Sequence, residues 1–244
     1  MEKILIVVPC YNEEESLPGL LTDLRSIRNE LNHLDFLFVN DCSSDNTEKV
    51  LAREKLPYVN HPINMGYNAA IQTGVRNGLD AGYENFIILD GDGQHPPIEI
   101  KKLIHAYEKG ADIVIGSRFK DGFDSTYEIS AIRKAGMMFF SFLTSILIGA
   151  KIKDTTSGYQ IFNDRVARAL LLIYEGQFPD AEVIFLLNLL KFRIAEVPVE
   201  MKRREMGESM FSSLASLYYP FRVVSGLMIA FGRYFVIKGK LANA

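Results

Sequence analysis

The sequence predicts an α/β fold with a mostly parallel central sheet flanked by helices. Short apolar segments typical of strands buried on both faces alternate with helical segments through residue 116. Two of these apolar segments, 35–40 and 86–89, end directly in a carboxylate, at the edge where such sheets bind their ligands. With 48% hydrophobic and 23% charged residues, the chain of 244 residues has enough apolar material for a large core.

The first half of the chain supplies most of the predicted sheet. Strands are predicted over residues 3–8, 35–40, 56–59, 86–89 and 112–116. Helices are predicted over residues 15–31, within 61–82 and over 98–110, with a short one ending at residue 51. Ser43, Ser44 and Asp45 would supply capping oxygens for the short helix. Gly74 and Gly78 belong to a stripe of small residues that would let their helix pack close to a sheet or to a ligand.

The alternation of strands and helices ends after residue 118. Residues 129–150 predict a long apolar helix, and residues 154–160 predict a loop rich in hydroxyl groups. A pair of helices is predicted over about 164–174 and 180–191, followed by a half-exposed strand at 193–198. The chain has no internal repeats or linker-like stretches, which predicts one domain with a C-terminal appendage.

The densest group of candidate ligands follows the apolar segment 86–89. Asp90 and Asp92 lie two residues apart, and in an extended chain side chains at this spacing point the same way. Together with the amide oxygen of Gln94 they would suit Mg²⁺ or Mn²⁺, and Gly91 would leave room for a ligand. A cation at the end of a buried strand would serve a substrate that carries a diphosphate. The alternative is a solvated turn in which the acids have no ligand.

Charge and cysteine content exclude several classes of protein. The net charge of -3 offers no strongly basic face of the kind that nucleic-acid binding requires. Cys10 and Cys42 are too few for a disulfide scaffold and predict a reducing compartment. The first strand turns acidic after a few apolar residues, unlike a signal peptide. Residues 137–150 and 218–237 fall short of the ~18–20 uninterrupted apolar residues of a transmembrane helix.

A series of short motifs runs in order along the chain. They are V-P-C-Y-N-E (8–13), N-D-C-S-S-D-N-T (40–47), N-M-G-Y-N-A-A (64–70), D-G-D-G-Q-H-P-P (90–97), G-S-R (116–118), T-S-G-Y (156–159) and R-E-M-G-E-S (204–209). This series, over roughly residues 3–211, resembles family 2 glycosyltransferases of the GT-A fold, which are Rossmann-like inverting enzymes that use nucleotide-diphosphate sugars. Within the family it is most similar to the dolichol-phosphate mannose synthases and the bacterial polyprenyl-phosphate glycosyltransferases.

The resemblance implies a role for each matched residue. The nucleotide-sugar site would comprise Pro9, Tyr11, Asn12, Glu13, Asp41, Asn64, Gly66, Asp90, Gly91 and Asp92. The metal, Mg²⁺ or Mn²⁺, would be bound by Asp90, Asp92 and Gln94. The acceptor phosphate would be bound by Arg118, Arg133, Ser157, Arg204 and Ser209. The residues implied in catalysis are Asp92, Arg118, Arg204, Asp180 and Glu182.

Some of these residues also have simpler interpretations. Asp41 could be only a turn or cap residue after a strand. Arg133 could be the solvated end of an apolar helix, and Arg204 lies in a run of charges of the kind that is usually just solvated. Asp180 and Glu182 could favour the N-terminus of a helix.

The predicted reaction moves a sugar from a nucleotide-diphosphate sugar to a polyprenyl (undecaprenyl) phosphate at the cytoplasmic membrane face, which supplies lipid-linked sugar for cell-envelope glycans. A UDP-linked donor is favoured over GDP-mannose. A phosphate monoester is ionised near pH 7, so its attack needs no general base. A family 2 enzyme that extends a cell-wall or capsular polysaccharide on a hydroxyl is the first alternative, and it would need Asp180 or Glu182 as a base. A non-catalytic nucleotide-sugar-binding subunit is the second.

The C-terminal segment predicts contact with a membrane surface. Residues 210–237 are apolar and aromatic with isolated arginines, and residues 199–244 contain seven Lys or Arg against three Glu. This pattern is typical of an amphipathic helix lying in the membrane plane. We therefore predict a glycosyltransferase domain over 1–208 and an interfacial helical appendage over 209–244, associated peripherally with the membrane. The alternatives are a core helix on the sheet or a surface for a small membrane-protein partner, and the possibility of a homo-oligomer is left open.

Overall fold

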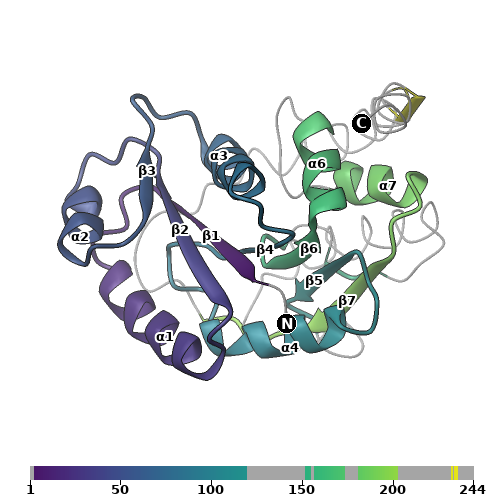
Figure 1. Cartoon of the computed structure of the whole chain (residues 1–244), viewed down its shortest axis with the longest axis horizontal. Helices are drawn as coiled ribbons and strands as arrows, with labels where there is room; N and C mark the ends of the chain where they lie inside the picture. Colours follow the sequence, from purple (N-terminus) through teal and green to yellow (C-terminus); the bar gives the residue numbers. More distant parts are fainter. Residues whose placement is uncertain are drawn as a thin grey trace, which may run out of the picture.

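The computed structural model describes residues 3–119, 152–154, 157–173, 181–202, 232, 234 and 235. These residues form a seven-stranded sheet in the order β3-β2-β1-β4-β6-β5-β7, with helices on both of its faces (Figure 1). Neighbouring strands are parallel except at β6, which runs antiparallel to β4 and to β5. The predicted α/β class with a mostly parallel sheet is confirmed.

Every described strand and helix except β6 overlaps the segment that predicted it. The strands are β1 (Ile4–Cys10), β2 (Leu34–Asn40), β3 (Tyr58–Asn60), β4 (Asn85–Ile88), β5 (Ile113–Ser117), β6 (Gln160–Asn163) and β7 (Ile194–Pro198). The helices are α1 (Leu17–Glu30), α2 (Thr47–Arg53), α3 (Tyr67–Asp80), α4 (Ile100–Tyr107), α6 (Asp164–Ile173) and α7 (Ala181–Leu189), and a short 3₁₀ turn, η1 (Pro97–Glu99), precedes α4.

Strand β6 was not predicted from the sequence. It is inserted between β4 and β5, pairing Phe162 with Phe86 on one side and with Ile113 on the other. The rings of Phe86 and Phe162 stack with their centroids 5.9 Å apart. Four residues are too few to show a clear strand period, and their β structure depends on partners at both edges. The loop preceding β6 is thereby fixed beside the ends of β4 and β5.

The side chains of β1 divide the apolar core into two layers. Leu5 and Val7 pack in one cluster with α3, α6 and α7, whereas Ile6 and Val8 pack in the other with α1 and α4. Successive residues of a strand point to opposite faces, so both faces of β1 are apolar because helices cover both. This double cover leaves the strand ends as the place where polar groups can gather.

Gly74 and Gly78 let α3 lie directly on the sheet. A Cβ atom at Gly74 would be 2.2 Å from Cγ1 of Val7, and one at Gly78 would be 2.5 Å from Cε1 of Phe86. The sequence left open whether this stripe packs against a sheet or against a ligand, and the structure shows that it packs against the sheet. The stripe thus sets how closely the C-terminal half of α3 lies on β1 and β4.

We expect Gly74→Ala to lower the free energy of unfolding by about 1–3 kcal/mol, because the added methyl must displace the β1 side chain beneath it. Gly19→Ala is the matched control, since Gly19 is exposed in α1 and an added Cβ would meet nothing within 4 Å. Although Gly19 lies in the first turn of α1, that change should stabilise by about 0.4–1 kcal/mol, because it reduces the conformational entropy of the unfolded chain. Urea unfolding of both variants checks the prediction, and equal effects of the same sign would contradict it.

Two predicted features lie outside the described residues, namely the apolar helix at 129–150 and most of the appendage at 209–244. Within the part of the chain that the structure describes, no helix is both long and apolar enough to cross a membrane. The division of the chain at residue 208 stays a prediction.

Candidate functional site

The ends of β1, β2, β4 and β5 bring predicted site residues to one edge of the sheet. The backbone N–H of Asp41 donates to the carbonyl of Cys10 (2.9 Å), and that of Gly91 donates to the carbonyl of Pro9 (3.2 Å). Arg118 directly follows β5. The expectation that these residues meet at the carboxyl edge of the sheet is confirmed.

A pocket of about 100 Å³ lies at this edge. Its lining residues are Asp90, Gln94, His95, Arg118, Ser157, Gly158, Met201 and Lys202. They come from the segments after β4 and β5, from the segment before β6 and from the segment after β7. The pocket therefore combines acidic and amide residues with two cationic residues, of which Lys202 also pairs its Nζ with Asp23 on α1 (3.4 Å).

The D-x-D segment has a different geometry from the predicted one. Strand β4 ends at Ile88, and Gly91 and Asp92 form a turn. The carboxylate of Asp92 accepts a hydrogen bond from the backbone N–H of Gln94 (3.0 Å), as in an Asx turn. The expectation that Asp90 and Asp92 project together from an extended chain is wrong, because the chain bends immediately after Asp90.

Gly91 is required by packing within the chain. A Cβ atom there would lie 2.9 Å from the carbonyl oxygen of Pro9 and 3.0 Å from Sγ of Cys10. The hydroxyl of Ser16 donates to the Gly91 carbonyl (2.9 Å). The space beside Gly91 is thus taken by the end of β1, which corrects the expectation that it is left open for a ligand.

The Asp90 side chain is fixed by its neighbours on the pocket wall. The hydroxyl of Tyr67, at the start of α3, donates to Oδ1 of Asp90 (2.6 Å). A Cβ at Gly158 would lie 2.7 Å from that hydroxyl, so only glycine leaves the contact undisturbed. The backbone N–H of Asp90 donates to Nδ1 of His95 (3.3 Å), whose ring stacks on Tyr159 with centroids 4.7 Å apart. The same Nδ1 lies 3.5 Å from Oδ2 of Asp90.

The oxygen donors of the pocket fit a divalent cation. Asp90 and Gln94 line it with a carboxylate and an amide, and such hard oxygen ligands suit Mg²⁺ and Mn²⁺. Among the described residues, no three His, Cys, Asp or Glu side chains come together as a metal site. Mg²⁺ commonly keeps several waters and binds through one or two carboxylates together with substrate phosphates.

Arg118 is held by a buried carboxylate that the sequence did not reveal. Its Nε donates to Oδ2 of Asp154 (2.7 Å) and its Nη2 donates to Oδ1 (2.5 Å). The Asp154 side chain is 0% exposed, and the Arg118 side chain is 12% exposed. A two-pronged pair of this kind fixes the guanidinium plane as well as its position.

The turn after β1 is joined to the turn after β2. The N–H of Asn12, a residue with φ 56°, donates to Oγ of Ser43 (3.0 Å), and the N–H of Ser44 donates to Oδ1 of Asn12 (2.8 Å). Only Asp45 of the three predicted caps bonds a backbone N–H at the start of α2, that of Thr47 (2.9 Å). Ser43 and Ser44 therefore connect the two strand ends, where they were expected to cap the helix.

Three further predicted residues lie in the segment after β1 or in the loop before α3. Tyr11 is 48% exposed, so its ring faces solvent beside the strand ends. Glu13 is fixed at both its backbone and its side chain, because its N–H donates to Oγ1 of Thr47 (2.8 Å) and its Oε2 accepts from Ser16 (2.6 Å). Asn64 is exposed in the loop between β3 and α3.

Asp41 is buried and its oxygens are occupied. Oδ1 lies 2.6 Å from Nδ1 of His61 and accepts from the N–H of Met65 (2.8 Å), while Oδ2 accepts from the N–H of Gly66 (2.7 Å). The other ring nitrogen of His61 lies 2.8 Å from Oγ1 of Thr73. Asp41 and His61 are 2% and 7% exposed. The carboxylate thus fixes the loop 61–66, in which Gly66 adopts φ 90°.

We expect His61→Ala to lower the free energy of unfolding by about 1–3 kcal/mol, because it removes one partner of a buried carboxylate. The amide protons of Met65 and Gly66 should also exchange faster with solvent. His105→Ala is the control, since His105 is exposed on α4. Denaturant unfolding and hydrogen exchange measure both effects, and unchanged protection at the two amides would refute the role given to His61.

The remaining predicted residues divide between described and undescribed parts of the chain. Ser157 lines the pocket and is buried, whereas Glu182 lies in the first turn of α7 and does not line it. The others lie outside the described residues: Arg133, Asp180, Arg204 and Ser209. The sequence did not single out Tyr67, Asp154 or Lys202 as site residues.

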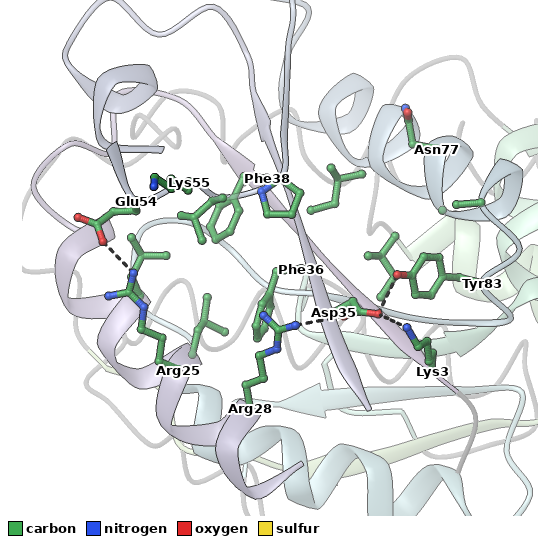
Figure 2. A pocket seen from close by; sticks show the side chains of 18 residues that line it. Lys3, Arg25, Arg28, Asp35, Phe36, Phe38, Glu54, Lys55, Asn77 and Tyr83 are labelled. Atoms are coloured by element: carbon green, nitrogen blue, oxygen red, sulfur yellow. Dashed lines mark hydrogen bonds and ion pairs between the residues drawn. The ribbon is translucent and has the colours of Figure 1, made fainter. Parts of the chain in front are cut away.

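A larger cavity of about 690 Å³ lies at the opposite edge of the sheet. Figure 2 shows Asp35 on β2 with Lys3 (3.3 Å) and the Tyr83 hydroxyl (2.8 Å) beside its carboxylate. Burial raises the pKa of Asp35, but Tyr83 and Lys3 outweigh it, so the net pKa is lowered. Arg25 also pairs with Glu54 (2.8 Å) across this cavity. Because its acids are paired and it lies at the amino ends of the strands, it is not the favoured site for a ligand.

Comparison with known proteins identifies the family of the chain. The model of the family described as "Glycosyl transferase family 2" matches residues 5–171. An undecaprenyl-phosphate mannosyltransferase of Micrococcus luteus is 33% identical over 218 residues, covering 86% of this chain and 88% of that protein. A polyprenol monophosphomannose synthase of Mycolicibacterium smegmatis is 29% identical over 223 residues, covering 86% of this chain and 82% of that protein.

Among solved structures, the fold matches glucosyl-3-phosphoglycerate synthase from Mycobacterium tuberculosis in complex with Mn²⁺, UDP-glucose and phosphoglyceric acid. The TM-score is 0.65 at 16% identity, covering 95% of this chain and 80% of that chain. At this identity the likeness concerns the fold alone. The family match and the two relatives, together with the carboxyl-edge pocket, show that the chain belongs to glycosyl transferase family 2 and has the GT-A fold.

Proposed function

We propose that the protein transfers a sugar from a UDP-linked donor to polyprenyl phosphate at the cytoplasmic membrane face, supplying lipid-linked sugar for cell-envelope glycans. The observation that carries this proposal is the pocket in which Asp90 and Gln94 lie beside Arg118 and Lys202. It offers oxygens for a cation and positive charge for phosphates in one place. The names of the two relatives support the same acceptor class.

The chemistry requires stabilisation of a leaving diphosphate. As the bond from the anomeric carbon to the donor oxygen breaks, negative charge develops on the β-phosphate. Mg²⁺ or Mn²⁺, held by Asp90 and Gln94, with Asp92 at the adjoining turn as a further candidate ligand, would supply Lewis-acid stabilisation of that charge, and the Mn²⁺ complex of the related fold supports a divalent metal. Arg118, already oriented by Asp154, would add a fixed positive charge that needs no reorganisation.

The acceptor side needs binding more than acid–base chemistry. A phosphate monoester is ionised near pH 7, so its oxygen can attack the anomeric carbon without losing a proton to the protein. Ser157 and Lys202 line the pocket and would bind this phosphate together with Arg118. Arg133, Arg204 and Ser209 are proposed to complete the acceptor site. Under this mechanism Asp180 and Glu182 are not required as bases.

The nucleoside would bind over the ends of β1 and β2. Tyr11 offers an exposed ring there, and Asn12 is fixed by the turn after β2. Because the Asp41 oxygens are occupied within the chain, we assign Asp41 the role of presenting the loop that carries Asn64 and Gly66. The nucleoside would thus contact this loop.

Membrane association is proposed from the composition of residues 199–244, with seven Lys or Arg against three Glu among apolar and aromatic residues. The proposal comprises peripheral binding of the appendage at 209–244, with a small membrane protein as a further partner. Binding to vesicles with and without anionic lipid, compared between the full chain and a chain ending at residue 208, would measure this contribution.

The test of function supplies a panel of UDP- and GDP-sugars with undecaprenyl phosphate and either Mg²⁺ or Mn²⁺, and follows nucleoside diphosphate release and the lipid product. We expect a sugar-phosphate lipid that forms with a UDP-sugar and is lost on addition of EDTA. Product only on an oligosaccharide acceptor would support the polysaccharide-extending alternative. Nucleotide binding without turnover on any acceptor would support a non-catalytic subunit.

A further inference from the structure

Glu196, on β7, connects two backbone segments that end at the pocket. Its carboxylate accepts the N–H of Asp154 (2.7 Å) and, through both oxygens, the N–H of Lys153 (3.0 Å each). The Ser117 side chain also hydrogen-bonds it. Since Glu196 is in register with Ile115 in the parallel pair of β7 and β5, its position is fixed by the sheet.

The segment that Glu196 holds in turn holds Arg118. Asp154 receives three hydrogen bonds from Arg118, two from the guanidinium and one from the backbone N–H (3.0 Å). A series of contacts therefore runs from the sheet through Glu196 and Asp154 to the guanidinium of Arg118 on the pocket wall. Every hydrogen bond in this series is accepted by one of two carboxylates, and neither carboxylate lines the pocket.

This arrangement places the half-buried Glu196 close to the fully buried Asp154. Burial raises the pKa of Glu196, and the nearby charge of Asp154 raises it further. Two carboxylates placed close together, of which only Asp154 is paired with a guanidinium, are an electrostatically costly way to join two strands, and apolar residues could do so without that cost. A role in orienting the Arg118 guanidinium would explain why two carboxylates occupy this junction.

We propose that Glu196 is a positioning residue, which orients Arg118 for the substrate phosphates by fixing the backbone of Asp154. This inference rests on the proposed function, because it assigns Arg118 to an anionic group of the substrate. The plain alternative is that Glu196 only stabilises the junction of β5 and β7. The two differ in what a neutral isostere should do and in what happens to the guanidinium itself.

Glu196→Ala and Glu196→Gln separate the two readings. Gln keeps an oxygen for the N–H of Asp154, so it should restore most of what Ala removes. For Glu196→Ala we expect kcat to fall about 10–100-fold while the donor KM changes little, by analogy with groups that orient metal ligands. Rates are compared per folded molecule, well below the melting temperature of each variant.

Asp112→Ala is the matched structural control. Asp112 is a buried acid at the other end of β5, and it accepts hydrogen bonds from Arg193 at the backbone (2.8 Å) and at Nε (3.3 Å). Its loss should destabilise the junction with β7 without altering kcat per folded molecule. If Asp112→Ala lowers kcat as much as Glu196→Ala does, Glu196 has only a structural role.

A second readout does not depend on turnover. The Nε–H resonance of Arg118, assigned by its loss in Arg118→Lys, should be protected from exchange in the wild type and in Glu196→Gln. It should lose that protection in Glu196→Ala. An unchanged resonance in Glu196→Ala overturns the inference whatever the activity, whereas loss of protection in a protein with no transferase activity would retain the positioning role and reject the proposed function.

Discussion

Asp90→Asn should reduce kcat/KM by about 10³-fold or more, because it removes the carboxylate charge from the pocket that is proposed to hold the diphosphate and its cation. The amide keeps an oxygen that can accept the Tyr67 hydroxyl, so the local packing should survive. Steady-state kinetics over a range of metal concentrations would measure the loss, which higher metal concentrations should only partly recover.

Tyr67→Phe is the control for Asp90→Asn, because it removes the hydroxyl that orients the carboxylate and leaves the charge in place. We expect a loss of about tenfold, at the lower end of the range for groups that orient metal ligands. If Asp90→Asn retains activity within tenfold of the wild type, the assignment of Asp90 to the cation is wrong.

Arg118→Ala should lower both stability and activity. The Asp154 side chain, 0% exposed, would lose its guanidinium partner, which should cost about 3–5 kcal/mol in the free energy of unfolding. Activity should fall by about 10²–10³-fold, because a fixed positive charge beside the leaving group is lost. Denaturant unfolding and steady-state kinetics give the two numbers on the same preparation.

The double variant Arg118→Ala with Asp154→Ala separates the two losses. Removing both partners leaves no unpaired buried charge, so stability should recover relative to Arg118→Ala alone. Activity should not recover, because the guanidinium of Arg118 is still missing. A double variant as active as the wild type would show that Arg118 serves only the fold.

The location of the site could be predicted because it follows from local patterns and from topology. Apolar segments predicted the parallel strands, and the carboxyl ends of parallel strands share one edge, which places Asp41, Asp90 and Arg118 at the same edge of the sheet. The close packing of α3 could also be predicted, because it follows from the small residues around Gly74 within one segment of the sequence.

The geometry within the site could not be predicted in the same way. β6 depends on partners at both of its edges, and its four residues give no period. Glu196 lies 42 residues from Asp154, and their contact depends on the register of β5 with β7. The turn at Asp92 and the burial of Asp41 depend on backbone N–H groups, which a pattern of side chains does not reveal.

The most direct test compares polyprenyl phosphate with a polyprenol of the same chain length as acceptors, with one UDP-sugar and Mn²⁺ or Mg²⁺. The mass of the lipid product and its initial rate of formation are measured. An acceptor that is already anionic, bound beside Arg118 and Lys202, should be glycosylated, and the neutral alcohol should give no product above background. Comparable rates with both lipids, or transfer only to an oligosaccharide hydroxyl, would contradict the proposed reaction.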